Sequence, residues 1–207
     1  MFCASSKGSY TLKESEIKKL TLLTPLKLYT PLTDEVIEKL RVGQRVLLNG
    51  VLLTARDAAH KKLNKFLELG NELPFSLKGL VIYYVAPTPA KPGQVIGSAG
   101  PTTSSRMDIY TPRLLALGIK GTIGHGKRSP QVVKALKKYQ AIYFVAVGGT
   151  AALIAKSIKE NRLIAFPELG AESIQELVVE NFPVIVANDI YGGDIYEEGW
   201  KKYAIKP

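Results

Sequence analysis

Strand-like and helix-like segments alternate through the middle of this chain. Apolar, β-rich runs at 81–86, 119–123 and 142–147 predict buried strands. Helical patterns fill the stretches around them, at 58–69, at 130–138 and after Thr150 to about Ile158. Such an alternation places at least part of the sheet in parallel order, with helices packed on it. The pattern therefore predicts an α/β fold.

Turn and cap signals predict the elements before this region. Thr33, followed by two acidic residues, opens a short helix that runs through Leu40. Asn49-Gly50 separates apolar runs at 45–48 and 51–55, and Asn-Gly supplies the positive φ that a type I′ turn needs. We therefore expect a tight hairpin over this stretch.

Four further signals concern helix starts and the C-terminal third. Asp57 is expected to cap the helix at 58–69, which Gly70 closes. Pro112 either kinks the helix that follows the loop at 97–105 or restarts it with Thr111 as cap. Ser129-Pro130 opens the helix at 130–138. The β-branched runs at 177–179 and 184–186 predict strands.

The chain divides into an N-terminal extension, residues 1–26, and one domain, residues 27–207. A short amphipathic helix is expected over 14–23. The sequence holds a single cysteine, Cys3, which can form no internal disulfide and cannot by itself hold a metal or an iron–sulfur cluster. No targeting signal and no membrane-spanning run is visible, so we expect a cytoplasmic protein without membrane contact.

The net charge of +10 and the pI of about 9.6 point to an acidic partner of some kind. An anionic substrate, an acidic subunit and a nucleic acid are all compatible with this charge. The lysines are scattered over helical segments, and no basic block with interleaved aromatic residues occurs. A non-catalytic module that binds anions or nucleic acid stays a separate hypothesis, and it predicts binding that weakens steeply with salt.

The loop at 97–108 carries the clearest functional signal. Gly97 and Gly100 allow the backbone to approach a ligand closely. Threonine and serine residues then lead into Arg106, and their hydroxyls are typical caps of a helix start. Free amides, the helix dipole and a guanidinium would converge on one small space. Such a space favours a carboxylate or a phosphate.

Two more glycine loops and one arginine complete the candidate set. The loop at 124–129 carries His125, Lys127 and Arg128, and Gly148-Gly149 follows the strand at 142–147. Arg56 precedes a helix, where its guanidinium can bind a carboxylate or form a surface ion pair with Asp57. None of these loops has the Walker or Rossmann spacing.

With these residues in view, the chain resembles the β subunit, or C-terminal domain, of the iron–sulfur class I fumarase and L-tartrate dehydratase family. The segments that carry the resemblance are Ala55-Arg56-Asp57-Ala58-Ala59-His60, Gly100-Pro101-Thr102-Thr103-Ser104-Ser105-Arg106-Met107-Asp108, Gly124-His125-Gly126-Lys127-Arg128-Ser129, Gly148-Gly149 and Pro167-Glu168-Leu169-Gly170. Their order and approximate spacing agree from about residue 27 to 196. The resemblance implies a swivelling β/β/α domain, with a central mixed sheet flanked by helices. It also implies a hydro-lyase that adds water reversibly to fumarate, or an L-tartrate dehydratase.

The resemblance also implies roles for individual residues. Thr102 and His125 would be catalytic, with Thr102 the general base that takes the C3 proton of malate. Arg56 and Arg106 would clamp the substrate carboxylates, and Lys127, Gly100 and Thr103 would line the same site. Many family members have lysine where this chain has His125, so either His125 replaces it or Lys127 reaches inward. This departure also leaves open a degenerate subunit that acts as a scaffold.

The partners follow from the same resemblance. A [4Fe-4S] cluster would be held by three cysteines of a separate, cysteine-rich α subunit, and no metal ligand would come from this chain. The substrate would be a small dicarboxylate. The assembly would be a heterotetramer or a homodimer of β chains, and this chain would be inactive without the α subunit.

Overall fold

The computed structural model describes residues 24–73, 75–202 and 204. The expected helix at 14–23 and most of the expected N-terminal extension lie outside these residues. The described strands are β1 (Leu26–Tyr29), β2 (Arg45–Thr54), β3 (Val81–Tyr83), β4 (Gly121–Gly124), β5 (Ile142–Val145), β6 (Ile158–Ala165) and β7 (Ile174–Asn188). The α-helices are α2 (Asp34–Ile37), α3 (Asp57–Glu68), α4 (Thr111–Ala116), α5 (Pro130–Tyr139), α6 (Ala151–Ala155) and α7 (Ile195–Glu198), and the 3₁₀ helices are η1 (Ser104–Met107), η2 (Pro167–Glu172) and η3 (Trp200–Lys202).

The strands form one mixed sheet that closes on itself. Strands β1 to β5 follow one another in parallel order, as the alternation of elements predicts. The long strand β7 then runs antiparallel to both β5 and β2, which closes the ring β2–β3–β4–β5–β7. Strand β6 pairs with the N-terminal part of β7, from Ile174 to Val179. The expected α/β class with a mixed sheet is confirmed.

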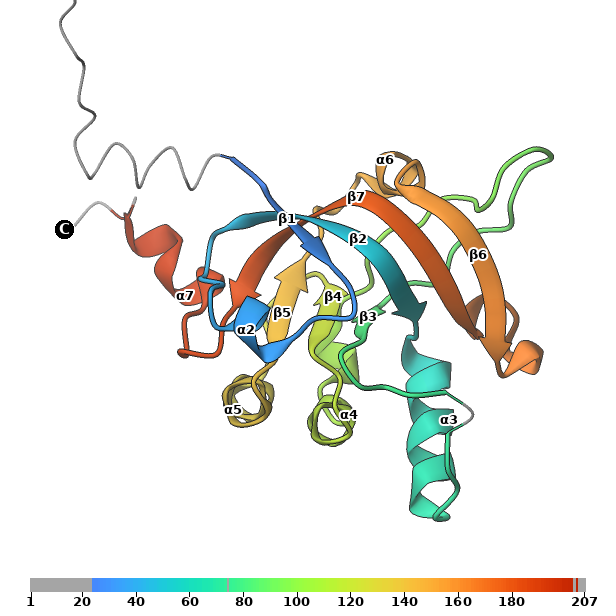
Figure 1. The fold of residues 1–207 in the computed structure, drawn as a ribbon, viewed down its shortest axis with the longest axis horizontal. Helices are drawn as coiled ribbons and strands as arrows, with labels where there is room; N and C mark the ends of the chain where they lie inside the picture. Colours follow the sequence, from blue (N-terminus) through green and yellow to red (C-terminus); the bar gives the residue numbers. More distant parts are fainter. Residues whose placement is uncertain (1–23, 74, 203, 205–207) are drawn as a thin grey trace, which may run out of the picture.

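Helices α3, α4 and α5 lie side by side along one side of the sheet (Figure 1). Their apolar residues recur at helical spacing: α5 buries Val132, Ala135 and Leu136, and α3 buries Ala59 and Leu63. These side chains form one core cluster with the sheet, and a second cluster, built around residues such as Tyr83, Phe144 and Phe182, includes residues from every strand of the ring. Burial on both faces of β3 and β5 explains their uninterrupted apolar sequences.

The expected hairpin at Asn49-Gly50 is wrong, because β2 runs straight through it. Gly50 has φ +101° and lies at a bulge opposite β7, where the register shifts between Leu48 and Gly50. A Cβ at Gly50 would lie 2.7 Å from the carbonyl oxygen of Thr30. The Asn49 side chain accepts a hydrogen bond from the backbone N–H of Asn181 on β7, at 2.9 Å. The positive φ therefore serves a bulge rather than a turn.

The other expectations differ from the structure mainly in extent. The helix after Thr33 ends at Ile37 rather than Leu40, and Thr33 makes no side-chain cap bond to it. The stretches 177–179 and 184–186 belong to one strand, β7. Ser129 accepts from the backbone N–H of Val132 and Pro130 is the first residue of α5, so this helix start is confirmed.

Candidate functional site

Three segments of the candidate site lie at the carboxyl ends of adjacent parallel strands. Arg56 follows β2 and precedes α3. The backbone N–H of Thr102 donates to the carbonyl oxygen of Tyr84, directly after β3, at 2.7 Å. His125 follows β4. Because β2, β3 and β4 are neighbours, these segments meet at one edge of the sheet, where α/β proteins commonly bind ligands.

Arg56 and Arg106 converge on one carboxylate. Asp57 Oδ2 lies 3.1 Å from Nε of Arg56 and 2.8 Å from Nη2 of Arg106. Glu172 Oε1 approaches Arg56 Nε at 3.5 Å. The Arg56 side chain is 25% exposed and that of Arg106 is 50% exposed, so both side chains are partly open to solvent beside the carboxylate that joins them. Two adjacent cations open to solvent are suited to binding an anion with two acidic groups.

The expected capping role of Asp57 is wrong. Helix α3 has Arg56 at its N-cap position and no side-chain cap bond. The backbone N–H of Ala58 donates instead to Oε2 of Glu172 in η2, at 2.8 Å. Asp57 is thereby free to hold the two arginines. The surface ion pair between Arg56 and Asp57, one of the two alternatives above, is present together with the Arg106 contact.

The loop that carries Thr102 is hydrogen-bonded to the loop that carries His125. Thr103 Oγ1 lies 3.2 Å from Nε2 of His125. The backbone N–H of His125 donates to the carbonyl oxygen of Thr102, and that of Ser104 donates to the carbonyl oxygen of His125. The Thr102 hydroxyl makes no hydrogen bond within the described part of the chain, so it is available to a ligand.

From the sequence we expected the hydroxyl cluster to cap a helix, and this expectation is wrong. Residues after Thr103 form the 3₁₀ helix η1, which has no side-chain cap bond. Thr103 contacts His125, and Ser104 Oγ lies 2.8 Å from the hydroxyl of Tyr143. A new helix, α4, then starts at Thr111 with Pro112 in its first turn, so the helix restarts rather than kinks, but its N-cap position is Tyr110 and not Thr111 as expected. The hydroxyls therefore join loops instead of closing a helix.

Gly100 and Lys127 lie at the margins of this arrangement. A Cβ on Gly100 would lie 3.1 Å from Cβ of Ala151 in α6. Lys127 is exposed and forms an ion pair with Glu197 of α7. That hydrogen bond raises the pKa of Lys127 and lowers the pKa of Glu197. The structure thus directs the Lys127 ammonium to α7, while His125 contacts the threonine loop.

Three residues that the sequence motifs already contain have structural parts in the site. Arg128 is 2% exposed and bonds Asp108, and His60 is fully buried with Nδ1 2.9 Å from the carbonyl oxygen of Arg56. Gly124 allows close loop approach, since a Cβ there would lie 2.8 Å from Tyr84 Cδ2. The spacing of charged residues gave no sign that Arg128 points inward while its neighbour Lys127 points outward.

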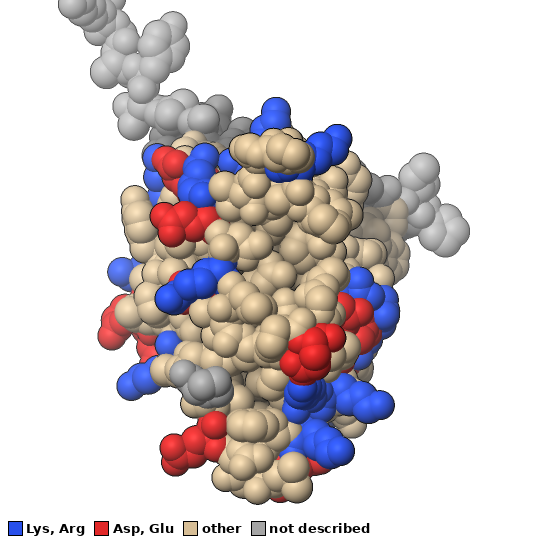
Figure 2. Space-filling model, turned by 90° about the vertical axis from the view of Figure 1, so that its right-hand side faces the viewer, with Lys and Arg blue, Asp and Glu red and all other residues tan. Residues whose placement is uncertain are grey.

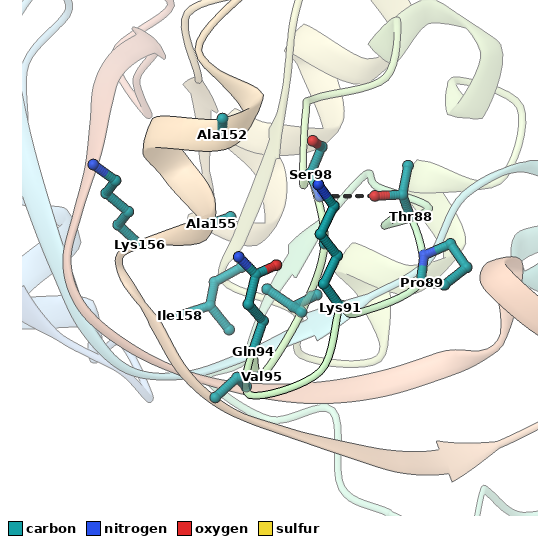
Figure 3. A pocket seen from close by; sticks show the side chains of 12 residues that line it. Thr88, Pro89, Lys91, Gln94, Val95, Ser98, Ala152, Ala155, Lys156 and Ile158 are labelled. Atoms are coloured by element: carbon teal, nitrogen blue, oxygen red, sulfur yellow. Dashed lines mark hydrogen bonds between the residues drawn. The ribbon is translucent and has the colours of Figure 1, made fainter.

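A separate cavity of about 450 Å³ lies between the 88–98 loop and α6. Lys91 and Lys156 stand on either side of Gln94 at this cavity (Figure 3). Gly97 lines it, but Arg56, Thr102 and Arg106 do not. The two glycines expected to serve one anion site therefore face different surroundings.

Charges are mixed on the face that carries β6, η2 and α3. Basic and acidic side chains lie next to one another there rather than forming one basic patch (Figure 2). Two of the contacts are pairs between elements: Lys62 of α3 with Glu168 of η2, and Arg162 of β6 with Glu176 of β7. Within the described residues, no helix has the length and apolar character needed to cross a bilayer.

The family model described as Fumarase C-terminus matches residues 5–199. This chain belongs to the fumarase C-terminus family. It is 41% identical over 180 residues to the putative L(+)-tartrate dehydratase subunit beta of Methanocaldococcus jannaschii, covering 84% of this chain and 92% of that subunit. It is 43% identical over 159 residues to fumarate hydratase 2 of Leishmania major, covering 76% of this chain and 28% of that protein.

Escherichia coli class I aerobic fumarate hydratase gives a similar match. The identity is 37% over 190 residues, which cover 89% of this chain and 33% of that enzyme. The chain therefore spans about a third of the fumarate hydratases it matches and nearly all of the tartrate dehydratase subunit. These relatives confirm the family that the sequence motifs indicated.

Proposed function

We propose that this chain is the β subunit of a class I fumarate hydratase, which interconverts fumarate and L-malate together with an α subunit. The convergence of Arg56 and Arg106 on one carboxylate carries the proposal, because it supplies two cations at solvent for a short dicarboxylate. The relatives named fumarate hydratase support the reaction class. We also propose that the ring of strands and its helices form the swivelling β/β/α domain of this family. We further propose that the enzyme is cytoplasmic.

Each site residue has a stated part in this proposal. Arg56 and Arg106 bind the carboxylates of the substrate and orient it. Thr102 removes the C3 proton of malate, or returns it to fumarate in the hydration direction. Removing that proton spreads negative charge onto the adjacent carboxylate, and the fixed guanidiniums stabilise this charge.

His125 and Lys127 have different parts in the proposal. A free threonine hydroxyl is a weak base, so neighbouring positive charge must favour its deprotonated form. His125 acts on the Thr102 loop through its contact with Thr103, and it takes the place of the lysine found in many relatives. Lys127 contributes positive charge from the rim while it is paired with Glu197.

The α subunit supplies the second half of the site. The donors on this chain are guanidiniums, hydroxyls and an imidazole, which suit the anionic ends of a substrate. The sequence holds one cysteine, whereas an iron–sulfur cluster is bound by several thiolates. We therefore propose that the cysteines of the α subunit bind a [4Fe-4S] cluster. When bound there, the cluster supplies a Lewis acid for the hydroxyl that leaves.

L-tartrate dehydratase is the second candidate. One observation favours it: the match to a putative tartrate dehydratase β subunit covers 92% of that subunit. Tartrate differs from malate by one hydroxyl, so both acids present the same two carboxylates to Arg56 and Arg106. The residues described here therefore fit either substrate.

Turnover of both acids by the assembled enzyme decides between these functions. The chain is combined anaerobically with its cysteine-rich α partner, and dehydration of L-malate and of L-tartrate is measured with the same preparation. Faster turnover of malate supports fumarate hydratase, and faster turnover of tartrate supports the second candidate. A complex with a loaded cluster that dehydrates neither acid rejects both.

A further inference from the structure

Arg128 differs from the other cations of its loop because it lies inside the protein. The residue is 2% exposed, whereas the Lys127 side chain is 54% exposed. A buried guanidinium is costly unless its donors are paired. The contacts of Arg128 therefore indicate what the buried charge does.

All three guanidinium nitrogens of Arg128 donate to buried oxygens. Nε donates to Oδ1 of Asp108 at 2.7 Å, and Nη2 donates to Oγ1 of Thr111 at 2.7 Å. Nη1 donates to the hydroxyls of Tyr84 and Thr122, each at 3.2 Å. The group also lies over the rings of Tyr84 and Tyr143, 5.3 and 4.9 Å from their centroids. The guanidinium therefore binds protein groups rather than a substrate.

The partners of Arg128 belong to the segments that carry the candidate site residues. Asp108 lies just after η1, which contains Arg106, and its Oδ2 accepts from the backbone N–H of Ser129 at 2.6 Å. The carbonyl oxygen of Tyr84 holds the backbone N–H of Thr102. One network thus reaches both ends of the stretch from Thr102 to Arg106.

Tyr143 extends the network to the His125 loop. Its hydroxyl donates to the carbonyl oxygen of Gly126 at 2.7 Å and pairs with Ser104 Oγ at 2.8 Å. Burial raises the pKa of Tyr143, so the hydroxyl keeps the proton that it donates. Arg128, which lies over this ring, therefore contacts groups that hold both loops.

We propose that Arg128 is a positioning residue, whose buried contacts with Asp108 and Tyr84 fix the 100–108 loop on the 124–129 loop. It thereby holds Thr102 against the His125 loop and Arg106 beside Asp57 and Arg56. This inference rests on the proposed hydro-lyase function for its catalytic consequence. Lysine at this position keeps the charge but cannot form the planar set of bonds to Asp108, Thr111 and Tyr84.

The activity test uses Arg128→Lys in the complex with the α subunit. We expect kcat/KM to fall about 100-fold, because a displacement of about 1 Å at a catalytic group can cost that much. In a Thr102→Ala background the same substitution should cost less than about 10-fold, since groups that act through one another are not additive. Activity of Arg128→Lys within about 3-fold of wild type, or an undiminished loss in the Thr102→Ala background, overturns the proposal.

Leu136→Ala is the matched control for stability. Leu136 is fully buried in α5, in the same core cluster as Tyr84 and Tyr143, but its side chain makes none of the hydrogen bonds of the network. Its truncation should cost about 2–5 kcal/mol of stability yet leave kcat/KM within about 3-fold at a temperature where the protein is folded. If Arg128→Lys fails to fold, Asp108→Asn replaces it, because it removes one charge and keeps the side-chain shape. An active Asp108→Asn enzyme then overturns the proposal.

A second readout separates this inference from the proposed function. The sequence has two histidines, so the His125 imidazole can be followed by NMR in the full chain without any partner. Arg128→Lys should shift the His125 resonances, and Leu136→Ala should not. If the wild-type complex converts neither malate nor tartrate, the proposed function fails, and this measurement still tests the placement of the loops. Unchanged His125 resonances in Arg128→Lys contradict that placement.

Discussion

Arg56 and Arg106 meet at a single oxygen, Asp57 Oδ2, although they come from different segments of the chain. Arg56 stands at the start of α3, and Arg106 lies in η1. Asp57 keeps two like charges close together before any ligand arrives. The two guanidiniums are therefore held close together in advance, which lowers the cost of ordering their side chains when a carboxylate of a ligand binds.

Replacing either arginine by lysine should weaken substrate binding. Lysine keeps the charge but loses the forked geometry that matches a carboxylate. We expect kcat/KM of the assembled enzyme to fall about 10- to 100-fold for Arg56→Lys and for Arg106→Lys, mainly through KM, as expected when a charge-assisted hydrogen bond is lost. Arg162→Lys, on the exposed strand β6, is the matched control and should match wild type. Unchanged KM in both site variants would contradict the clamp.

Thr102→Ala should remove the proposed base. Its loss should lower kcat by about 10²- to 10⁴-fold and change KM little, since the arginines remain. Thr102→Ser, which keeps a hydroxyl, should recover part of the rate. Thr33→Ala, at the start of α2, serves as the control. A subunit that acts only as a scaffold predicts full activity in Thr102→Ala, so that result would refute the catalytic role.

His125 and Lys127 can be separated by their own substitutions. His125 contacts Thr103 in the catalytic loop, whereas Lys127 is paired with Glu197 of α7. We expect His125→Ala to lower kcat of the assembled enzyme by at least about 10-fold more than Lys127→Ala does. Comparison of the two rates with one α-subunit preparation measures this. A larger loss of kcat in Lys127→Ala would show that Lys127 has the role of the lysine that many relatives carry at the position of His125.

His60 should make the stability of the chain depend on pH. Burial lowers the pKa of His60 from 6.5 to about 4, while its Nδ1–H donates to the Arg56 carbonyl oxygen. Below pH 6.5 the unfolded chain binds a proton that the folded chain does not. The folded state therefore loses stability as the pH falls from about 6.5 to about 4, by about 2 kcal/mol between pH 7 and pH 5.

Urea unfolding at both pH values measures this loss. His60→Asn is the comparison, because its amide can still donate to the Arg56 carbonyl oxygen but does not titrate. The wild type should lose about 2 kcal/mol more than His60→Asn over this range, since the carboxylates are common to both proteins. Equal losses in the free energy of unfolding of the two proteins would show that the fold does not hold His60 neutral.

Gly124→Ala should disturb the contact between the two site loops. A Cβ there would lie 2.8 Å from Tyr84 Cδ2 and 3.1 Å from the carbonyl oxygen of Thr102. We expect a loss of about 1–3 kcal/mol in the free energy of unfolding, the usual cost of overpacking, together with lower activity. Gly148→Ala is the control, because nothing lies within 4 Å of its added Cβ. Equal stability of the two variants would contradict the close approach.

Local signals in the sequence predict elements well where the structure uses local contacts. Ser129 and Pro130 start α5 as their types suggest, because the cap bond spans only three residues. The parallel order of β2 to β5 follows from the alternation of strands and helices. Asn49-Gly50 fails as a turn signal, because its positive φ is used against Thr30 and β7, which lie far away in the sequence.

The candidate site shows the same division. The motifs bring Arg56, Thr102, Arg106 and His125 to one edge of the sheet, as a βα arrangement implies. Their exact partners depend on residues that are distant in the chain. Glu172, rather than Asp57, accepts the hydrogen bond from the backbone N–H of Ala58 at the start of α3, and Glu197 forms the ion pair with Lys127. Arg128 is buried because Asp108, Thr111 and Tyr84 surround it, and no local spacing encodes that cluster.

The most direct test of the central claim is complementation of activity. This chain, its cysteine-rich α partner with a loaded cluster, and the mixture of the two are each assayed anaerobically for hydration of fumarate. The proposal predicts that neither subunit alone is active, that the mixture forms L-malate, and that Arg56→Met/Arg106→Met removes the activity without preventing assembly. The claim that this chain supplies half of the site would be contradicted if the α subunit alone hydrated fumarate as fast as the wild-type mixture does. The same rate in the mixture with the double variant would also contradict it.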